Sequence, residues 1–187
     1  ATAAALDTLA LLYQELGCLQ NALSPAERAL SIFVQALGLH HPHTATVLHH
    51  LTLLYRKLGR PEEALPFAQR ALSIREHALG PHHPQTARSL SALAALYHEL
   101  GRSEEALPLA QRSLSICEQV LGPDHPHTAT ALHNLALLYR ALGRLQDALP
   151  LAERALSIRE QTLGPHHPLT SQSHVLCRQL RRALDEP

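Results

Sequence analysis

The sequence predicts an all-α fold, a solenoid built from stacked helical hairpins. A unit of 42 residues recurs four times, and apolar side chains follow a helical period twice within each unit. Glycine and proline residues mark the ends of both helical stretches. Because a hairpin of two short helices cannot bury its own apolar stripe, neighbouring hairpins must stack on one another.

The repeat is visible in residues that recur at intervals of 42 positions. They are Gly17, Gly59, Gly101 and Gly143, a second series of Gly38, Gly80, Gly122 and Gly164, the tyrosines Tyr13, Tyr55, Tyr97 and Tyr139, and His-Pro pairs beginning at His41, His83, His125 and His167. We place the units at 1–42, 43–84, 85–126 and 127–168, and residues 169–187 match the first half of a fifth unit. The sequence therefore predicts one domain over residues 1–187, with nine helices and a polar C-terminal helix that caps the stack.

The fourth unit shows the two predicted helices most clearly. Residues 128–142 have apolar side chains at the i, i+3, i+4, i+7 spacing of an amphipathic helix, here called helix A. Gly143 follows where a left-handed residue ends a helix, and residues 146–163 form a second apolar stripe, helix B. We expect the proline of each His-Pro pair in the first turn of the next helix A. Prolines inside helix B indicate either a bend or a late helix start, and they are Pro66, Pro108 and Pro150.

Composition and charge narrow the possible functions. Sixteen basic residues balance sixteen acidic residues, so no overall charge draws the protein to nucleic acid or to an anionic membrane. Polar residues interrupt every leucine-rich stretch well before membrane-spanning length. Three cysteines at unrelated positions do not form a disulfide framework, which predicts a reducing, cytoplasmic location.

The sequence contains no catalytic motif that we can identify. His98 and Glu99 begin a zinc-protease pattern, but position 102 is Arg102 where the second histidine is needed. No P-loop, dinucleotide-binding loop or nucleophile elbow is present. We therefore predict that the protein is not an enzyme and needs no cofactor.

Histidine pairs recur in the loops, but their spacing argues against a metal site. Copies of one loop lie a repeat apart, roughly 10 Å from typical helix packing, whereas zinc ligands lie about 2.1 Å from the ion. We predict no metal site, with adventitious surface binding near His40, His41 and His43 as the alternative.

The pattern Leu135-Ala136-x-x-Tyr139, followed by Gly143 and Ala148, resembles the tetratricopeptide repeat. The longer string NLALLYRALGRLQDALPLAERALSIREQTLGPHHP is similar to the 42-residue repeats of the kinesin light chain and nephrocystin-like type. This resemblance covers the four full units. It implies a right-handed superhelical solenoid of helix-turn-helix hairpins, in which helices A line a concave groove for an extended peptide and helices B form the convex back.

The resemblance places the peptide-binding groove at helix A positions that vary between units. Carried over to this sequence, the candidates are His49, His50, Leu53, Arg56 and Lys57 in the second unit, Arg88, Ser91, Ala92, Ala95 and His98 in the third, and His133, Asn134, Leu137 and Arg140 in the fourth. Tyrosines, glycines and the helix B alanines are interpreted as scaffold. Asn134 matches an asparagine that such repeats use to hold a ligand backbone, since a carboxamide both donates and accepts hydrogen bonds.

The candidate residues also predict the chemistry of the ligand. Small residues in the third unit, flanked by Leu53 and Leu137, predict an apolar hollow for a bulky partner side chain. The arginines make units two to four locally basic, which predicts an acidic ligand. We expect the groove histidines, at a reference pKa of about 6.5, to add positive charge below that pH.

The sequence therefore predicts a protein–protein interaction scaffold that binds an acidic peptide segment. One alternative is a self-assembly module or a regulatory repeat array of a larger protein. A nucleic-acid-binding helical repeat is less favoured, because it needs a basic stripe with stacking aromatic side chains and the four tyrosines are interpreted as scaffold.

Overall fold

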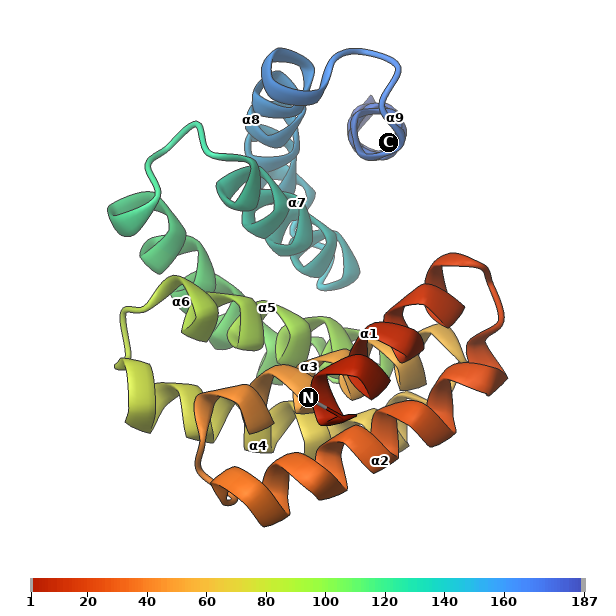
Figure 1. Ribbon diagram of the computed structural model, residues 1–187. Coiled ribbons are helices and arrows are strands. Elements are labelled where there is room, and N and C mark those ends of the chain that lie inside the picture. Colours follow the sequence, from red (N-terminus) through yellow and green to blue (C-terminus); the bar gives the residue numbers. More distant parts are fainter. Residues whose placement is uncertain (1, 186–187) are drawn as a thin grey trace.

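The computed structural model describes residues 2–185, and within this range every regular element is a helix (Figure 1). The helices are α1 (Thr2–Glu15), α2 (Leu19–Leu37), α3 (Pro42–Lys57), α4 (Pro61–Leu79), α5 (Pro84–Glu99), α6 (Ser103–Val120), α7 (Pro126–Ala141), α8 (Leu145–Leu163) and α9 (Pro168–Asp185). Odd-numbered helices are helices A and even-numbered ones are helices B, which confirms the all-α prediction and its nine helices over the described range. Residues 1, 186 and 187 of the predicted units lie outside that range. No helix between residues 2 and 185 is both long and apolar enough to cross a membrane.

The His-Pro pairs start the helices A. Helices α3, α5, α7 and α9 all begin at the proline of such a pair, whose missing N–H costs nothing at the first helical position. The histidine before each proline accepts a hydrogen bond at Nδ1 from the backbone N–H two residues further on, at 3.1–3.2 Å. These histidines thus satisfy an N–H that the first turn would otherwise leave unpaired, as cap residues do.

Gly143 ends α7 in the predicted left-handed conformation, with φ of +73°. The N–H groups of Gly143 and Arg144 donate to the carbonyl oxygens of Arg140 and Tyr139, at 3.1 and 2.8 Å. The Arg144 guanidinium then lies over the Tyr139 ring, 4.4 Å from its centroid. The repeated glycine and the repeated tyrosine therefore serve the same turn, in the scaffold role that the sequence predicts.

Helices B run without interruption through their internal prolines. Pro66 lies inside α4, Pro108 inside α6 and Pro150 inside α8. Each proline removes one backbone hydrogen bond near the start of its helix. Of the two alternatives, a bend or a late helix start, the late start is wrong, because each helix B begins ahead of its proline.

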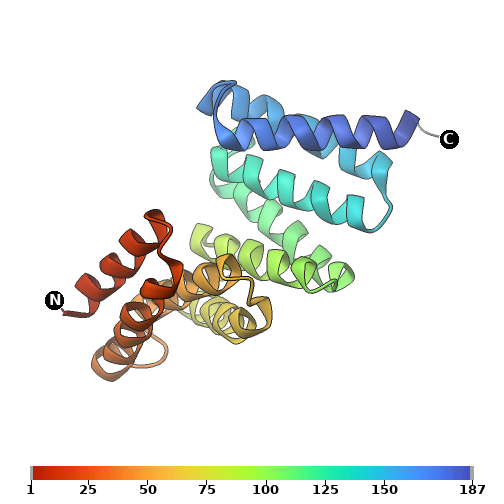
Figure 2. The same cartoon turned by 90° about the vertical axis from the view of Figure 1, so that its right-hand side faces the viewer.

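The contacts between helices show which side of the solenoid is concave. Each helix packs against its neighbours in the chain, and helices A also contact one another as the pairs α1–α3, α3–α5, α5–α7 and α7–α9. Within the described residues no such contact joins successive helices B. Because the inner elements of a curved stack lie closer together than the outer ones, helices A form the concave side. Figure 2 shows this stack from the side, with the two ends of the chain at opposite ends.

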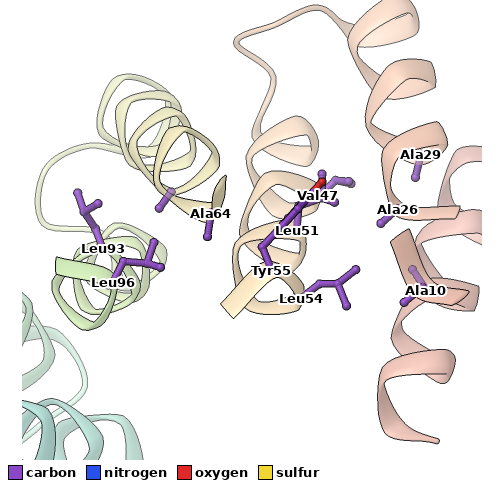
Figure 3. Close-up of a cluster of buried hydrophobic side chains, with 12 residues drawn as sticks. Ala10, Ala26, Ala29, Val47, Leu51, Leu54, Tyr55, Ala64, Leu93 and Leu96 are labelled. Atoms are coloured by element: carbon purple, nitrogen blue, oxygen red, sulfur yellow. The ribbon is translucent and has the colours of Figure 1, made fainter. Parts of the chain in front are cut away.

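The core is continuous from one hairpin to the next. Buried Ala26 of α2 and Ala64 of α4 lie on either side of Leu51 of α3, and the same cluster reaches Leu96 of α5 (Figure 3). Small alanines on helices B let the backbones approach closely, while leucines from helices A fill the space between hairpins. At the other end, buried Leu176 of α9 belongs to a cluster with alanines of α8. The capping role of α9 stays a prediction.

Candidate peptide-binding groove

Three hollows follow one another along the concave face. The first, of about 240 Å³, lies over Ser91 and Ala92 of α5. The second shares Ala95 and Asn134 with the first, and the third shares Leu137 with the second and reaches α9. The shared residues make these hollows one continuous groove over α3, α5, α7 and α9.

Most of the sequence-predicted candidates line this groove. The first hollow includes His49, Leu53, Arg56, Arg88, Ser91, Ala92, Ala95 and Asn134, the second adds His98 and Leu137, and the third adds His133 and Arg140. His50 and Lys57 line none of the three hollows. Nδ1 of His50 instead contacts a carboxylate oxygen of Asp7 at 2.9 Å, which ties α3 to α1.

Two small side chains line the first hollow where neighbouring repeats carry an arginine and a serine. Cys117 of α6 and Ala131 of α7 line this hollow. The residues at the position of Cys117 in the preceding and following units are Arg75 and Arg159. Sequence reasoning missed these two arginines, because the candidate groove residues were taken from helices A and these arginines lie on helices B. The signal was available in the sequence, since each is followed 14 residues later by a serine, Ser89 or Ser173.

Arg75 and Arg159 are buried cations without a carboxylate partner. Each is 2% exposed. Nη1 of Arg75 donates to Ser89 Oγ at 2.8 Å, and Nη1 of Arg159 donates to Ser173 Oγ at the same distance. No ion pair found among residues 2–185 joins either arginine to an acidic side chain, and Nε of Arg159 is buried without a hydrogen-bond partner. Burial lowers the pKa of Arg75 to about 10 and also lowers the pKa of Arg159.

The buried groove histidines are neutral at physiological pH. Burial, together with the nearby Arg75 and Arg88, lowers the pKa of His49 to about 3. Burial, together with Arg159 and Arg140, lowers the pKa of His133 to about 4. Burial likewise lowers the pKa of His98.

The expectation that groove histidines gain charge just below the reference pKa of about 6.5 is therefore wrong for His49 and His133. The physical reason is that a buried imidazole beside arginine cannot take up a proton without desolvating a second positive charge. The positive charge of the groove must come from its arginines.

Two of the groove arginines are already paired with side chains of the neighbouring repeats. Arg56 forms an ion pair with Glu99, with Nε of Arg56 3.1 Å from Oε2 of Glu99. Arg140 donates to the amide oxygen of Gln179. Arg88 is exposed and has a long contact of 3.4 Å to the side-chain oxygen of Gln85. Arg88 and Arg140 are thus the groove cations least neutralised by the protein itself.

Asn134 keeps part of its hydrogen-bonding capacity for a ligand. Its Nδ2 donates to Ser91 Oγ at 3.0 Å, which uses one of its two N–H bonds. The carboxamide oxygen can still accept from a peptide N–H. The predicted backbone clamp at Asn134 stays a prediction.

Neither the histidines nor the cysteines converge on a metal site in the described part of the chain. No group of three or more His, Cys, Asp or Glu side chains with a suitable arrangement occurs between residues 2 and 185. The rings of His41 and His43 stack with centroids 5.2 Å apart, while Nδ1 of His41 is used in the helix cap. Cys117 and Cys177 are buried, and burial raises the pKa of both thiols.

Stacked hairpins around a groove of inner helices define an α-solenoid. The family model described as tetratricopeptide repeat matches residues 1–77, 53–119, 93–161 and 130–185 in overlapping segments. The chain therefore belongs to the tetratricopeptide repeat family. Solenoids of this family generally serve as scaffolds for protein–protein interaction. No curated protein matches the sequence.

Solved structures place the chain among kinesin light chain-like repeat proteins. A Podosopora anserina protein of the kinesin light chain type, with nearly identical TPR-like repeats, is 28% identical with a TM-score of 0.80, and the match covers 97% of this chain and 86% of that one. A substituted form of the same protein has a TM-score of 0.82, at the same sequence identity and with the same share of each chain covered. BtubC (BKLC) from P. vanneervenii is 24% identical with a TM-score of 0.80, covering 97% and 72% of the two chains, and shows the fold alone.

Proposed function

We propose that this protein is an adaptor that binds an extended segment of a partner protein in the concave groove. The observation that carries this proposal is the hollow over Ser91, Ala92 and Ala95, which opens among polar residues on the inner face of the solenoid. The α-solenoid fold supports it, because the fold presents this inner face to a ligand along several repeats.

The hollow favours a bulky apolar or aromatic anchor on the ligand. Leu53 of α3 lines the first hollow and Leu137 of α7 lines the second, so both ends of the small-residue stretch are apolar. An aromatic side chain buries roughly 150–250 Å² and commonly dominates peptide affinity. The third repeat is therefore the proposed anchor site.

Acidic residues are the proposed neighbours of the anchor. Arg88 lines the first hollow and Arg140 lines the third, so cations lie on both sides of the anchor site. No acidic side chain lines the first hollow. Charge complementarity of this kind raises the association rate and selects against basic ligands.

The double variant Arg88→Glu with Arg140→Glu is expected to weaken the binding of an acidic, tryptophan-containing peptide about tenfold in 50 mM salt. The loss should be smaller in 500 mM salt, because screening already removes part of the attraction there. Isothermal titration of the peptide, and of its tryptophan-to-alanine form, measures both effects. The tryptophan-to-alanine form should bind weakly to the unmodified protein.

The matched control is Arg28→Glu with Arg70→Glu, which reverses two exposed arginines on helices α2 and α4. It should leave affinity unchanged. If both double variants weaken binding equally, or if neither changes the affinity, the binding site does not lie on the concave face. Light scattering over a concentration series, run on the same samples, reports any self-assembly.

A further inference from the structure

We propose that His49 and His133, backed by the buried guanidinium groups of Arg75 and Arg159, form two anion-binding sites that hold two acidic side chains of one peptide ligand. This inference rests on the proposed function of the groove and specifies where its acidic contacts lie. The sites belong to the second and fourth repeats, on either side of the anchor hollow in the third.

A chain of hydrogen bonds defines the site at His133. Nη1 of Arg159 donates to Ser173 Oγ at 2.8 Å, and Ser173 Oγ lies 3.3 Å from Nδ1 of His133. Because the hydroxyl oxygen accepts from arginine, its hydrogen is available to Nδ1. A neutral imidazole that accepts at Nδ1 carries its proton on Nε2. His133 lines the third hollow, so this Nε2–H is the donor available to a groove ligand.

The same three residue types recur two repeats earlier. His49, Arg75 and Ser89 each precede His133, Arg159 and Ser173 by 84 residues. Nη1 of Arg75 donates to Ser89 Oγ at 2.8 Å, as in the later copy. His49 lines the first hollow and is 6% exposed. The repeat between them breaks the pattern, with Ser91 and Cys117 at the positions of the histidine and the arginine.

Charge around each histidine favours an anion. The charged or titratable groups that act on His49 are Arg75 of α4, Arg88 of α5 and, on α3 itself, His50 and Arg56. Those that act on His133 are Arg159 of α8 and Arg140 of α7. No carboxylate acts on either imidazole, although Asp7 of α1 contacts His50 and Glu99 of α5 pairs with Arg56.

A ligand carboxylate would supply the counter-ion that Arg75 and Arg159 lack. A buried guanidinium without a counter-ion is costly, and its field is weakly screened in a low-dielectric interior. At His133, the hydrogen-bond chain that begins at the Arg159 guanidinium also strengthens the donor at its far end. An acidic side chain that accepts from the histidine therefore gains a charge-assisted contact and compensates the buried arginine at the same time.

The spacing of the two sites predicts the spacing of the acids. Neighbouring helices pack 8–10 Å apart, so sites two repeats apart are separated by roughly 20 Å. An extended chain spans about 3.3 Å per residue, so the two acids should be about six positions apart. The anchor residue then falls midway between them, over the hollow of the third repeat.

Two synthetic peptides with identical composition test this arrangement. Glu-Ala-Ala-Trp-Ala-Ala-Glu has acids six positions apart, and Ala-Ala-Glu-Trp-Glu-Ala-Ala has them two apart. Both are capped at their ends and carry the same charge, and the order of their side chains is the same in either binding direction. The wide-spaced peptide is expected to bind at least ten times more tightly to the intact protein.

The variant Arg159→Cys with Ser173→Ala copies the pair that the chain itself uses at Cys117 and Ala131. This variant should bind the wide-spaced peptide about tenfold more weakly and should leave the affinity for the close-spaced peptide unchanged. His133→Phe keeps the ring volume and the buried arginine but removes the donor, and should have the same effect.

The control Arg154→Gln removes one charge from the same helix as Arg159, at a residue that pairs with Glu118 outside the groove. Circular dichroism melts show which variants are folded.

The outcomes separate this inference from the proposed function. Unchanged affinity for the wide-spaced peptide in either folded variant overturns the anion sites. If the two peptides bind the unmodified protein with equal affinity and neither binds the Ala95→Leu protein, the anion sites are overturned but binding in the groove is retained. Failure of both peptides to bind the unmodified protein overturns both proposals.

Discussion

Ala95→Leu is expected to reduce the affinity for tryptophan-containing acidic peptides by about 30-fold or more. Ala95 lines both the first and the second hollow, so three added carbon atoms occupy the space proposed for the ligand anchor. Loss of a buried anchor typically costs about 2 kcal/mol or more of binding free energy, which corresponds to this factor. Fluorescence anisotropy with a labelled peptide measures the change.

The substitution should not impair folding, because Ala95 is only partly buried and faces open space in the hollow. Ala78→Leu is the matched control, since it makes the same change at an exposed position of α4 on the other side of the solenoid. This control should bind like the unmodified protein. A folded Ala95→Leu protein with full affinity would show that the anchor lies elsewhere.

Lowering the pH from 7 to 5 is expected to destabilise the protein by about 4 kcal/mol through His49 and His133 alone, roughly 2 kcal/mol for each. The folded-state pKa values are about 3 for His49 and about 4 for His133. In the unfolded chain both histidines titrate near pH 6.5. The unfolded state therefore binds more protons below that pH, so the free energy of unfolding falls as the pH falls from about 6.5 towards 4 and then 3.

Urea denaturation followed by circular dichroism at several pH values tests this expectation. The double variant His49→Gln with His133→Gln should lose much less stability between pH 7 and pH 5 than the unmodified protein. His82→Gln with His166→Gln, at two exposed loop histidines, should retain the original pH dependence. Parallel pH curves for the two double variants would contradict the assignment of neutral, buried imidazoles.

The fold could be predicted almost completely from the sequence, because a solenoid repeats its local signals. Gly143 marks the end of α7 in the expected left-handed conformation, and the apolar spacing identifies both helices of each hairpin. The apolar spacing marks helix A only from residue 128, whereas α7 begins at Pro126, where the His-Pro pair predicts the first turn. The cap that His125 forms there was not predicted, because histidine is not among the usual cap residues.

Which residues line the concave hollows could largely be predicted from the sequence, but the protonation and pairing of their side chains could not. Contacts between successive helices A decide which charges remain available, and they depend on packing across repeats. Three such contacts join residues 43 positions apart: His50 to Asp7, Arg56 to Glu99 and Asn134 to Ser91. This constant offset could have been found in the sequence once helix A was assigned to the inner face. Burial of His49 could not, because it depends on how closely α3 and α5 approach.

Photo-crosslinking with a benzoyl-phenylalanine at the tryptophan position of the wide-spaced peptide tests the central claim most directly. The anchor is proposed to enter the hollow of the third repeat, so mass spectrometry should place the crosslink on α5, α6 or α7, at residues such as Ala92, Ala95 or Cys117 that line the hollow. Excess unlabelled peptide should suppress it. Crosslinks on exposed faces of α2, α4 or α8, with none in the hollow, would contradict binding in the concave groove.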